Sequence, residues 1–148
     1  MSTFNFGVKV NSPFADITDA ALGAAAGEGW ITGDVGKAVK MGTAQNYVLA
    51  VGGNELEGFV TSVEPNTVNA GFSFGGVQRD GRVEVEVGAA QVGNVTVGNY
   101  AVGDTQAAVG TAGAAKVKEG SPTIFRWRIV RIVTGTGASG DTIIIERV

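Results

Sequence analysis

The residues with the most obvious chemical potential begin in a glycine-rich stretch, GDVGKAV, at residues 33–39. In a phosphate-binding loop, backbone amides bind phosphate and a lysine reaches its terminal groups. Here the first glycine is wrongly spaced from Gly36 and Lys37, and Ala38 stands where a hydroxyl residue would bind magnesium. We therefore predict a turn that leads into a strand.

A second stretch, GTGASGD at residues 135–141, loosely matches the glycine-rich fingerprint of dinucleotide-binding proteins. That fingerprint must follow a strand and open a helix. The sequence that comes next, TIIIERV, has the composition of a strand. A hairpin loop is the better interpretation.

Two pairs of carboxylates, Glu55/Glu57 and Glu84/Glu86, are spaced two residues apart. On a strand each pair projects from one face, and a glycosidase can use two carboxylates at such a separation. The aromatic and polar sugar-binding residues of a glycosidase are not evident around them. We favour solvated strand faces.

Other catalytic chemistry is limited by composition, because the chain has no histidine and no cysteine. This removes the commonest general base, the usual partner of a serine nucleophile, thiolate metal sites and disulfides. No serine lies in a nucleophile elbow or a Ser-x-x-Lys context, and no aspartate has calcium-loop spacing. We expect no catalytic, cofactor or metal site, and predict that the protein is not an enzyme.

The elements that would position these residues are short strands. Glycine occurs 24 times in 148 residues, 44% of residues are hydrophobic, and runs rich in Val, Ile, Thr and Phe alternate with turn residues. This pattern predicts an all-β fold, a short-stranded β-sandwich or small barrel, with a body at residues 30–148. Residues 1–29 are predicted to form an extended N-terminal arm, with a short helix over residues 15–26 as the alternative.

A hairpin is predicted in GGVQRDGRVEVEV, residues 75–87, with its turn at Asp80 and Gly81. Val83, Val85 and Val87 would share an apolar face with Phe72, Phe74 and Gly76, while Glu84 and Glu86 face solvent. The hairpin would then be scaffold.

A second hairpin is predicted at the C-terminus, where IFRWRIVRIV and TIIIERV flank the loop TGTGASGD. Alternation breaks near Val130, which a β-bulge would explain. The run Ile143 to Ile145 predicts a strand covered on both faces, or one whose second face meets another subunit. In this hairpin Arg126, Trp127 and Arg128 form either an interface cluster or a buried tryptophan flanked by solvated arginines.

Charge and hydropathy restrict the partners. The net charge of −3 and the pI of about 4.9 argue against nucleic acid. No apolar run reaches the ~20 residues of a membrane helix, and the start of the chain does not match a signal peptide. We expect synthesis in the cytoplasm and no membrane partner.

The order of glycine-valine turn units across residues 30–120 resembles the decoration, or cement, proteins of tailed-bacteriophage capsids. It is carried by GKAVKMG, YVLAVGGNELEGFVTSV, GFSFGGVQRDGRVEVEVGA and VGNYAVGDTQAAVGTAG. The resemblance implies a structural virion protein on the outer surface of the mature capsid, made in the host cytoplasm. Its partners would be the major capsid protein and itself, as a homodimer or homotrimer, at the joins between capsid subunits.

The residues themselves suggest the contacts for such a role. The phenylalanine-bearing arm would add a strand to an exposed capsid sheet edge, with Phe4, Phe6 and Phe14 as anchors. Arg126, Trp127 and Arg128, of types enriched at protein interfaces, would form a second contact. The alternatives are a phage fibre or baseplate protein, and a carbohydrate-binding or adhesive β-sandwich. The sugar-binding aromatics in the last case would be Trp30, Tyr47, Tyr100 and Trp127.

Overall fold

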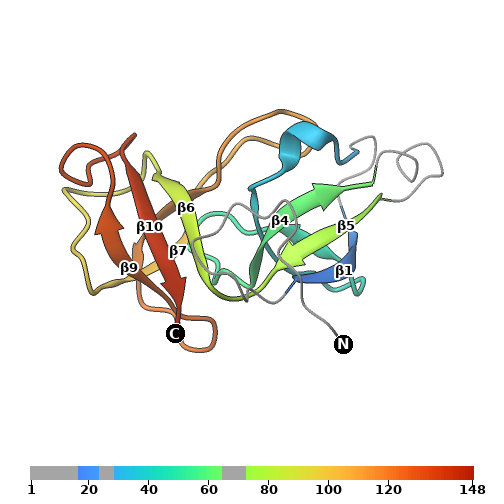
Figure 1. The fold of residues 1–148 in the computed structure, drawn as a ribbon, viewed down its shortest axis with the longest axis horizontal. Coiled ribbons are helices and arrows are strands. Elements are labelled where there is room, and N and C mark those ends of the chain that lie inside the picture. Colours follow the sequence, from blue (N-terminus) through green and yellow to red (C-terminus); the bar gives the residue numbers. More distant parts are fainter. Residues whose placement is uncertain (1–16, 24–28, 65–72) are drawn as a thin grey trace.

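The computed structural model describes residues 17–23, 29–64 and 73–148. It is an all-β protein with two five-stranded sheets, each of which closes into a barrel (Figure 1). The predicted all-β class with a small barrel is confirmed. The body predicted as one unit at residues 30–148 contains two such barrels, lying side by side along the long axis of the molecule.

The first barrel has the strand order β1-β3-β2-β4-β5. All its strand pairs are antiparallel except β1 with β3. A short 3-10 helix, η1, precedes β2. The elements are β1 (Ile17–Leu22), η1 (Thr32–Asp34), β2 (Ala38–Met41), β3 (Tyr47–Leu49), β4 (Gly58–Val63) and β5 (Ser73–Gln78).

The second barrel has the strand order β10-β6-β8-β7-β9, with β6 and β8 parallel. Its β9-β10 pair is the C-terminal hairpin that the sequence predicts. The strands are β6 (Arg82–Val87), β7 (Tyr100–Gly103), β8 (Lys116–Gly120), β9 (Trp127–Ile132) and β10 (Thr142–Arg147).

The hairpin predicted around Asp80 and Gly81 is wrong. β5 pairs with β1 and β4, whereas β6 pairs with β8 and β10, so the turn passes the chain from one barrel to the other. Gly81 has a φ of 78°, a left-handed conformation that favours glycine both in a hairpin turn and in a turn that joins two sheets. The turn chemistry was therefore correct, but the pairing partners lie elsewhere in the chain.

Side-chain alternation in β6 follows the prediction. Val83, Val85 and Val87 are buried and Glu84 is exposed. Phe74 in β5, expected on the same apolar face, is 37% exposed because β5 belongs to a different sheet.

The N-terminal prediction also needs correction, because β1 lies within the range assigned to an arm or a helix. Its backbone pairs with β5 over the whole strand, Ile17 opposite Gln78 and Leu22 opposite Ser73. Gly75 of β5 lies tightly between its neighbours: a Cβ there would stand 2.1 Å from the carbonyl oxygen of Ser62 in β4 and 3.0 Å from Leu22 Cδ1 in β1. Sheet pairing thus overrides the alanine-rich composition. The predicted anchors Phe4, Phe6 and Phe14 lie outside the described residues.

The bulge predicted near Val130 is confirmed. Ile145 lies opposite Ile129 and Ile144 opposite Arg131, which leaves Val130 as the extra residue of β9. Ile143, Ile144 and Ile145 are at most 6% exposed, so β10 is covered on both faces within one chain.

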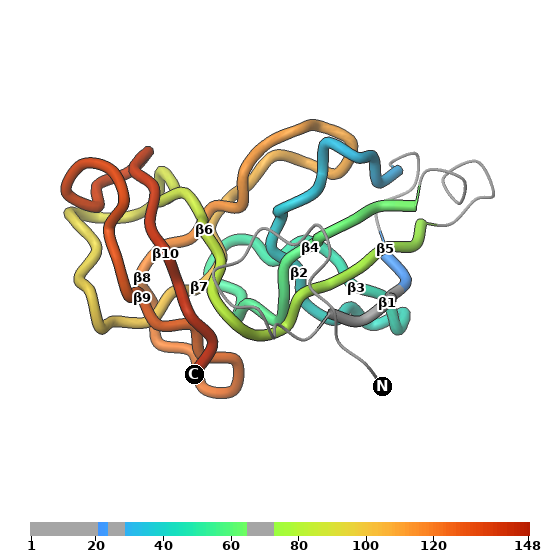
Figure 2. Tube along the Cα trace, in the orientation of Figure 1, coloured from blue at the N-terminus to red at the C-terminus, as the bar shows by residue number. Residues whose placement is uncertain are grey.

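The connection between β7 and β8, residues 104–115, leaves the second barrel, runs along the first and returns; we call it the strap. Figure 2 shows it reaching the segment around η1. Val109 of the strap packs in the core of the first barrel with Trp30, Val39 and Val77. Conversely, Leu56 and Phe59 of the first barrel join the core of the second. The two barrels therefore share their hydrophobic interior.

Candidate interaction surface

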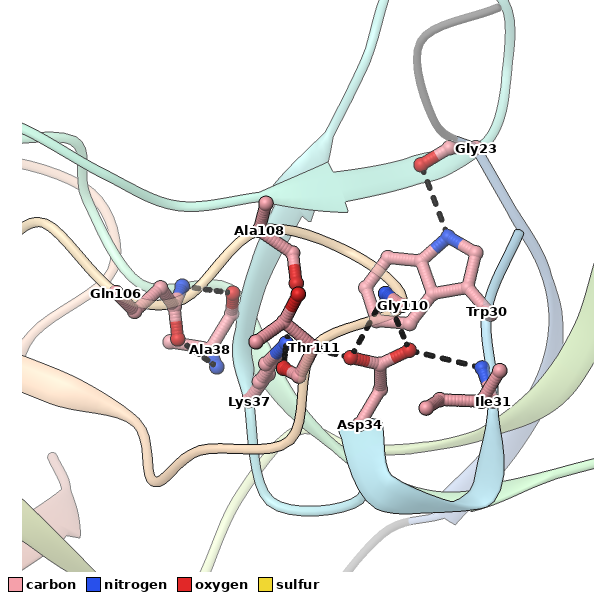
Figure 3. A network of polar contacts seen from close by, with 10 residues as sticks. All are labelled: Gly23, Trp30, Ile31, Asp34, Lys37, Ala38, Gln106, Ala108, Gly110 and Thr111. Carbon is pink, nitrogen blue, oxygen red and sulfur yellow. Dashed lines mark hydrogen bonds and ion pairs between the residues drawn. The ribbon is translucent and has the colours of Figure 1, made fainter. Parts of the chain in front are cut away.

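The lysine of the glycine-rich stretch at residues 33–39 is enclosed in the protein. Its Nζ lies 2.5 Å from Asp34 Oδ1, and both side chains are fully buried (Figure 3). Nζ also donates to the strap carbonyls of Ala108 (2.8 Å) and Thr111 (2.5 Å). Lys37 thus fastens the strap to the first barrel, and its ammonium has no access to a phosphate.

Asp34 completes this arrangement from the opposite side. Its carboxylate accepts the N–H groups of Ile31 (2.8 Å) and, from the strap, Gly110 (3.0 Å to Oδ2). Each charge is therefore paired and hydrogen-bonded, as burial of an ion pair requires. We call Asp34, Lys37 and their strap partners the strap lock.

Gln106 adds a second fastening, which sequence reasoning missed. Its Oε1 accepts the N–H of Ala38 (3.2 Å), and its Nε2 donates to the carbonyls of Ala38 (2.8 Å) and Ala50 (2.9 Å). One side chain thus bonds the β2 and β3 region to the strap (Figure 3). The spacing of Asp34 and Lys37 was a usable sequence signal, whereas an isolated glutamine in a loop gives none.

In the loop at residues 135–141, the carboxylate of Asp141 occupies the space toward which the backbone amides of the loop point. Asp141 Oδ2 accepts the N–H groups of Thr136 (3.1 Å), Gly137 (3.1 Å) and Ala138 (3.0 Å). These converging amides are the feature that binds phosphate in other loops. Here they hold the hairpin turn, in agreement with the prediction.

The glutamates of the two carboxylate pairs, Glu55/Glu57 and Glu84/Glu86, each lie in a different environment. Glu57 accepts the N–H of Met41, while Glu86 forms an ion pair with Lys116 at 2.6 Å. Glu84 is exposed on β6. Neither pair surrounds a common site.

Glu55 reaches from the first barrel to the second. Its carboxylate accepts the N–H groups of Phe125 (2.7 Å) and Ile124 (2.8 Å) and the hydroxyl of Thr123 (3.1 Å). These bonds, led by that from Phe125, lower the pKa of Glu55 below its ordinary value, because they stabilise the charged form.

Trp127 belongs to the core, so its assignment as an interface residue is wrong and the alternative holds. It is fully buried, its Nε1–H donates to the Leu56 carbonyl (2.9 Å), and its ring meets Phe59 edge-on at 5.0 Å. Tryptophan has the largest side chain, so its burial contributes a large apolar area to the core that the two barrels share. Trp30 and Tyr47 are buried too, which leaves Tyr100 as the surface member of the four aromatic candidates.

Arg126 and Arg128 are exposed, and the structure brings them together with other charged groups. Cross-strand pairing aligns Tyr100, Arg128, Glu146 and Arg82 around the outside of the second barrel. A parallel row holds the exposed Arg131 and Glu84, on either side of the buried Ile144. We call these outward residues of β6, β7, β9 and β10, with Arg126, the arginine face.

Contacts at both ends of the row that begins at Tyr100 order the side chains of this face. The guanidinium of Arg126 lies 6.0 Å from the ring centroid of Tyr100, and Arg82 pairs with Glu146 at 3.4 Å. Ile124, in the turn before β9, is 70% exposed. Beside Tyr100 is a shallow pocket of about 430 Å³, lined by Gly98, Asn99, Tyr100, Glu119, Gly120 and Ser121.

No family model, curated protein or solved structure matches this chain. Within the described ranges, no three Asp or Glu residues come together as a metal-ion site. None of the described helices has the length and hydropathy needed to cross a bilayer.

Proposed function

We propose that this chain is a structural virion protein, a capsid decoration or cement protein of a tailed bacteriophage. It would bind the outer surface of the mature capsid, across the joins between subunits, with the major capsid protein and further copies of itself as partners. The resemblance of residues 30–120 to such proteins supports this proposal.

The observation that carries the proposal is the firm joining of two small barrels. The strap lock, Gln106, Glu55 and the shared core around Trp127 all connect one barrel to the other. The result is an elongated body with two outer surfaces held in a fixed relation (Figure 1). Such a body can contact two neighbouring subunits at once.

Bivalent contact would make the protein an effective cement. Once one barrel is bound, the second is held at high effective concentration near its own site. A protein that binds only the expanded lattice stabilises it by RT ln(1 + [L]/Kd), about 2.7 kcal/mol per site at a hundredfold excess over Kd. Many sites on one shell multiply this effect.

The test is a pelleting assay with capsids assembled from the major capsid protein that the proposal takes as the partner. The purified protein should sediment with expanded capsids, remain in solution with unexpanded ones, and raise the temperature at which expanded capsids disrupt. Equal binding to both forms, or to neither, would contradict the proposal.

The pocket beside Tyr100 favours carbohydrate binding as the second candidate, because an aromatic ring there adjoins polar groups. Glu119, at its rim, already accepts bonds from Thr96 N–H (2.9 Å) and Asn99 Nδ2 (2.7 Å). A glycan array would decide: hits that Tyr100→Ala abolishes would support this candidate, and a blank array would remove it.

A further inference from the structure

We infer that the arginine face of the second barrel docks against a carboxylate-rich surface of a partner protein. The inference rests on the proposed function in taking that partner to be a capsid subunit. The charge of the face, its unpaired guanidinium groups and its geometry point to a carboxylate ligand.

The charge of the face is opposite to that of the molecule. The chain carries −3 overall, yet Arg82, Arg126, Arg128 and Arg131 gather here against Glu84 and Glu146. An acidic partner surface would be repelled by the protein as a whole and attracted by this face. Charge complementarity therefore favours a partner surface with negative charge and directs that surface to the arginine face.

Two of these arginines are available for new bonds. Arg128 and Arg131 are exposed, and neither forms an ion pair or a side-chain hydrogen bond with any described residue. Guanidinium groups are weakly hydrated and bind carboxylates through two parallel hydrogen bonds. They are the side chains best suited to recognise a carboxylate at an interface.

The bulge at Val130 creates this arrangement. Residues 128 and 131 are three apart, so in a regular strand they would point to opposite sides. The extra residue at Val130 shifts the in-and-out alternation by one position. As a result Arg128 and Arg131 both point outward, while Ile129 and Ile132 pack on the core. The two guanidinium groups consequently stand on one side of the sheet.

The face fits a protein better than a nucleic acid. Glu146 lies between Arg128 and Arg82 in the register, and Glu84 shares a row with Arg131, so a continuous line of phosphates would meet repulsion. Tyr100 adds an aromatic ring beside Arg126, and Ile124, two residues before Arg126 in the chain, is exposed. Arginine, tyrosine and apolar groups together are typical of protein interfaces.

The test uses the full chain and two variants with the same change in net charge. Arg128→Glu/Arg131→Glu alters β9 in the face, and Lys40→Glu/Lys118→Glu alters β2 of the first barrel and β8, which lies two strands from both β9 and β10 in the second. The probe is fluorescent poly-L-glutamate, titrated by anisotropy at low and physiological salt. We expect salt-sensitive binding by the unmodified chain, a loss of about tenfold or more in the arginine variant, and a change within about twofold in the lysine variant.

Several outcomes would overturn the inference: no binding of poly-L-glutamate, or equal losses in both variants. Tighter, arginine-dependent binding of double-stranded DNA would indicate a phosphate ligand instead. Arginine-dependent self-association in analytical ultracentrifugation would indicate a second copy as the occupant. Capsid pelleting separates the two proposals, since the face can bind poly-L-glutamate while capsids are not bound, or the reverse.

Discussion

Glu55 is a partly buried carboxylate whose hydrogen bonds all go to the turn before β9 in the other barrel. Because these bonds favour the charged form, they lower its pKa and link protonation to the contact between barrels. The stabilisation is present above the ordinary pKa of a glutamate. It is lost as the pH falls through the lowered pKa of the folded protein.

Glu55→Gln should therefore lower the thermal midpoint at neutral pH. The difference from the unmodified protein should persist down to about pH 5 and vanish in stronger acid, since both proteins then carry an uncharged side chain. Differential scanning calorimetry across pH measures this. Glu84→Gln, which removes the same charge from an exposed position of β6, should leave the midpoint unchanged; an equal effect of both changes would contradict the role of Glu55.

At the scale of the element, β9 combines a core strand and a binding surface through one extra residue. Trp127, Ile129 and Ile132 face the core, while Arg128 and Arg131 face outward. The bulge lets one strand meet both needs, core packing and outward arginines. Side chains alternate regularly before Val130 and again after it, with one extra residue between the two segments.

Deleting Val130 should consequently be tolerated, whereas deleting Ile144 should not. The first deletion leaves a strand in which Ile129, Arg131 and Ile132 alternate correctly, and we expect a loss of about 0.5–3 kcal/mol in the free energy of unfolding. The second shifts β10 by one residue, so that Ile145 and Glu146 exchange faces. Near-UV circular dichroism should retain the tryptophan signal in the first variant and lose most of it in the second.

The sequence was informative where the signal is local. Alternation in residues 82–87 predicted the buried valines, and the break in alternation near Val130 predicted the bulge. Asp80 and Gly81 also have real turn chemistry, but a turn does not state which strands it joins. The pairing of β5 with β1 depends on contacts across the whole first barrel, for which a single sequence carries no local pattern.

The candidate surface was predictable in part for the same reason. The exposure of Arg126 and Arg128 follows from strand alternation. Their grouping with Arg82 and Glu146 requires the register of β6, β10 and β9, which no spacing in the sequence encodes. Likewise, the burial of Lys37 depends on a strap more than seventy positions away.

At the scale of the whole molecule, the shared core and the strap predict that the two barrels unfold together. Each barrel contains one of the two tryptophans, Trp30 in the first and Trp127 in the second, and both are fully buried. The protein thus carries a natural reporter for each half.

Fluorine NMR of 5-fluorotryptophan-labelled protein should show both resonances disappearing over the same range of urea. Lys37→Met leaves Asp34 buried without its cation. It should lower the free energy of unfolding by about 3–5 kcal/mol and move both tryptophan transitions together to lower urea. Lys40→Met, at a half-buried position of β2 outside the strap lock, should shift neither by a comparable amount. Separate midpoints for the two tryptophans would show that the barrels are independent.

The strap also sets the order in which the protein can be completed during synthesis. The strands of the first barrel leave the ribosome before Val109, Gln106 and the lysine-binding carbonyls, all of which that barrel needs. At about 5–20 residues per second, the interval is on the order of seconds. The N-terminal half therefore waits, incompletely packed, for a segment translated after the first two strands of its neighbour, and the nascent chain matures as one unit rather than one barrel at a time.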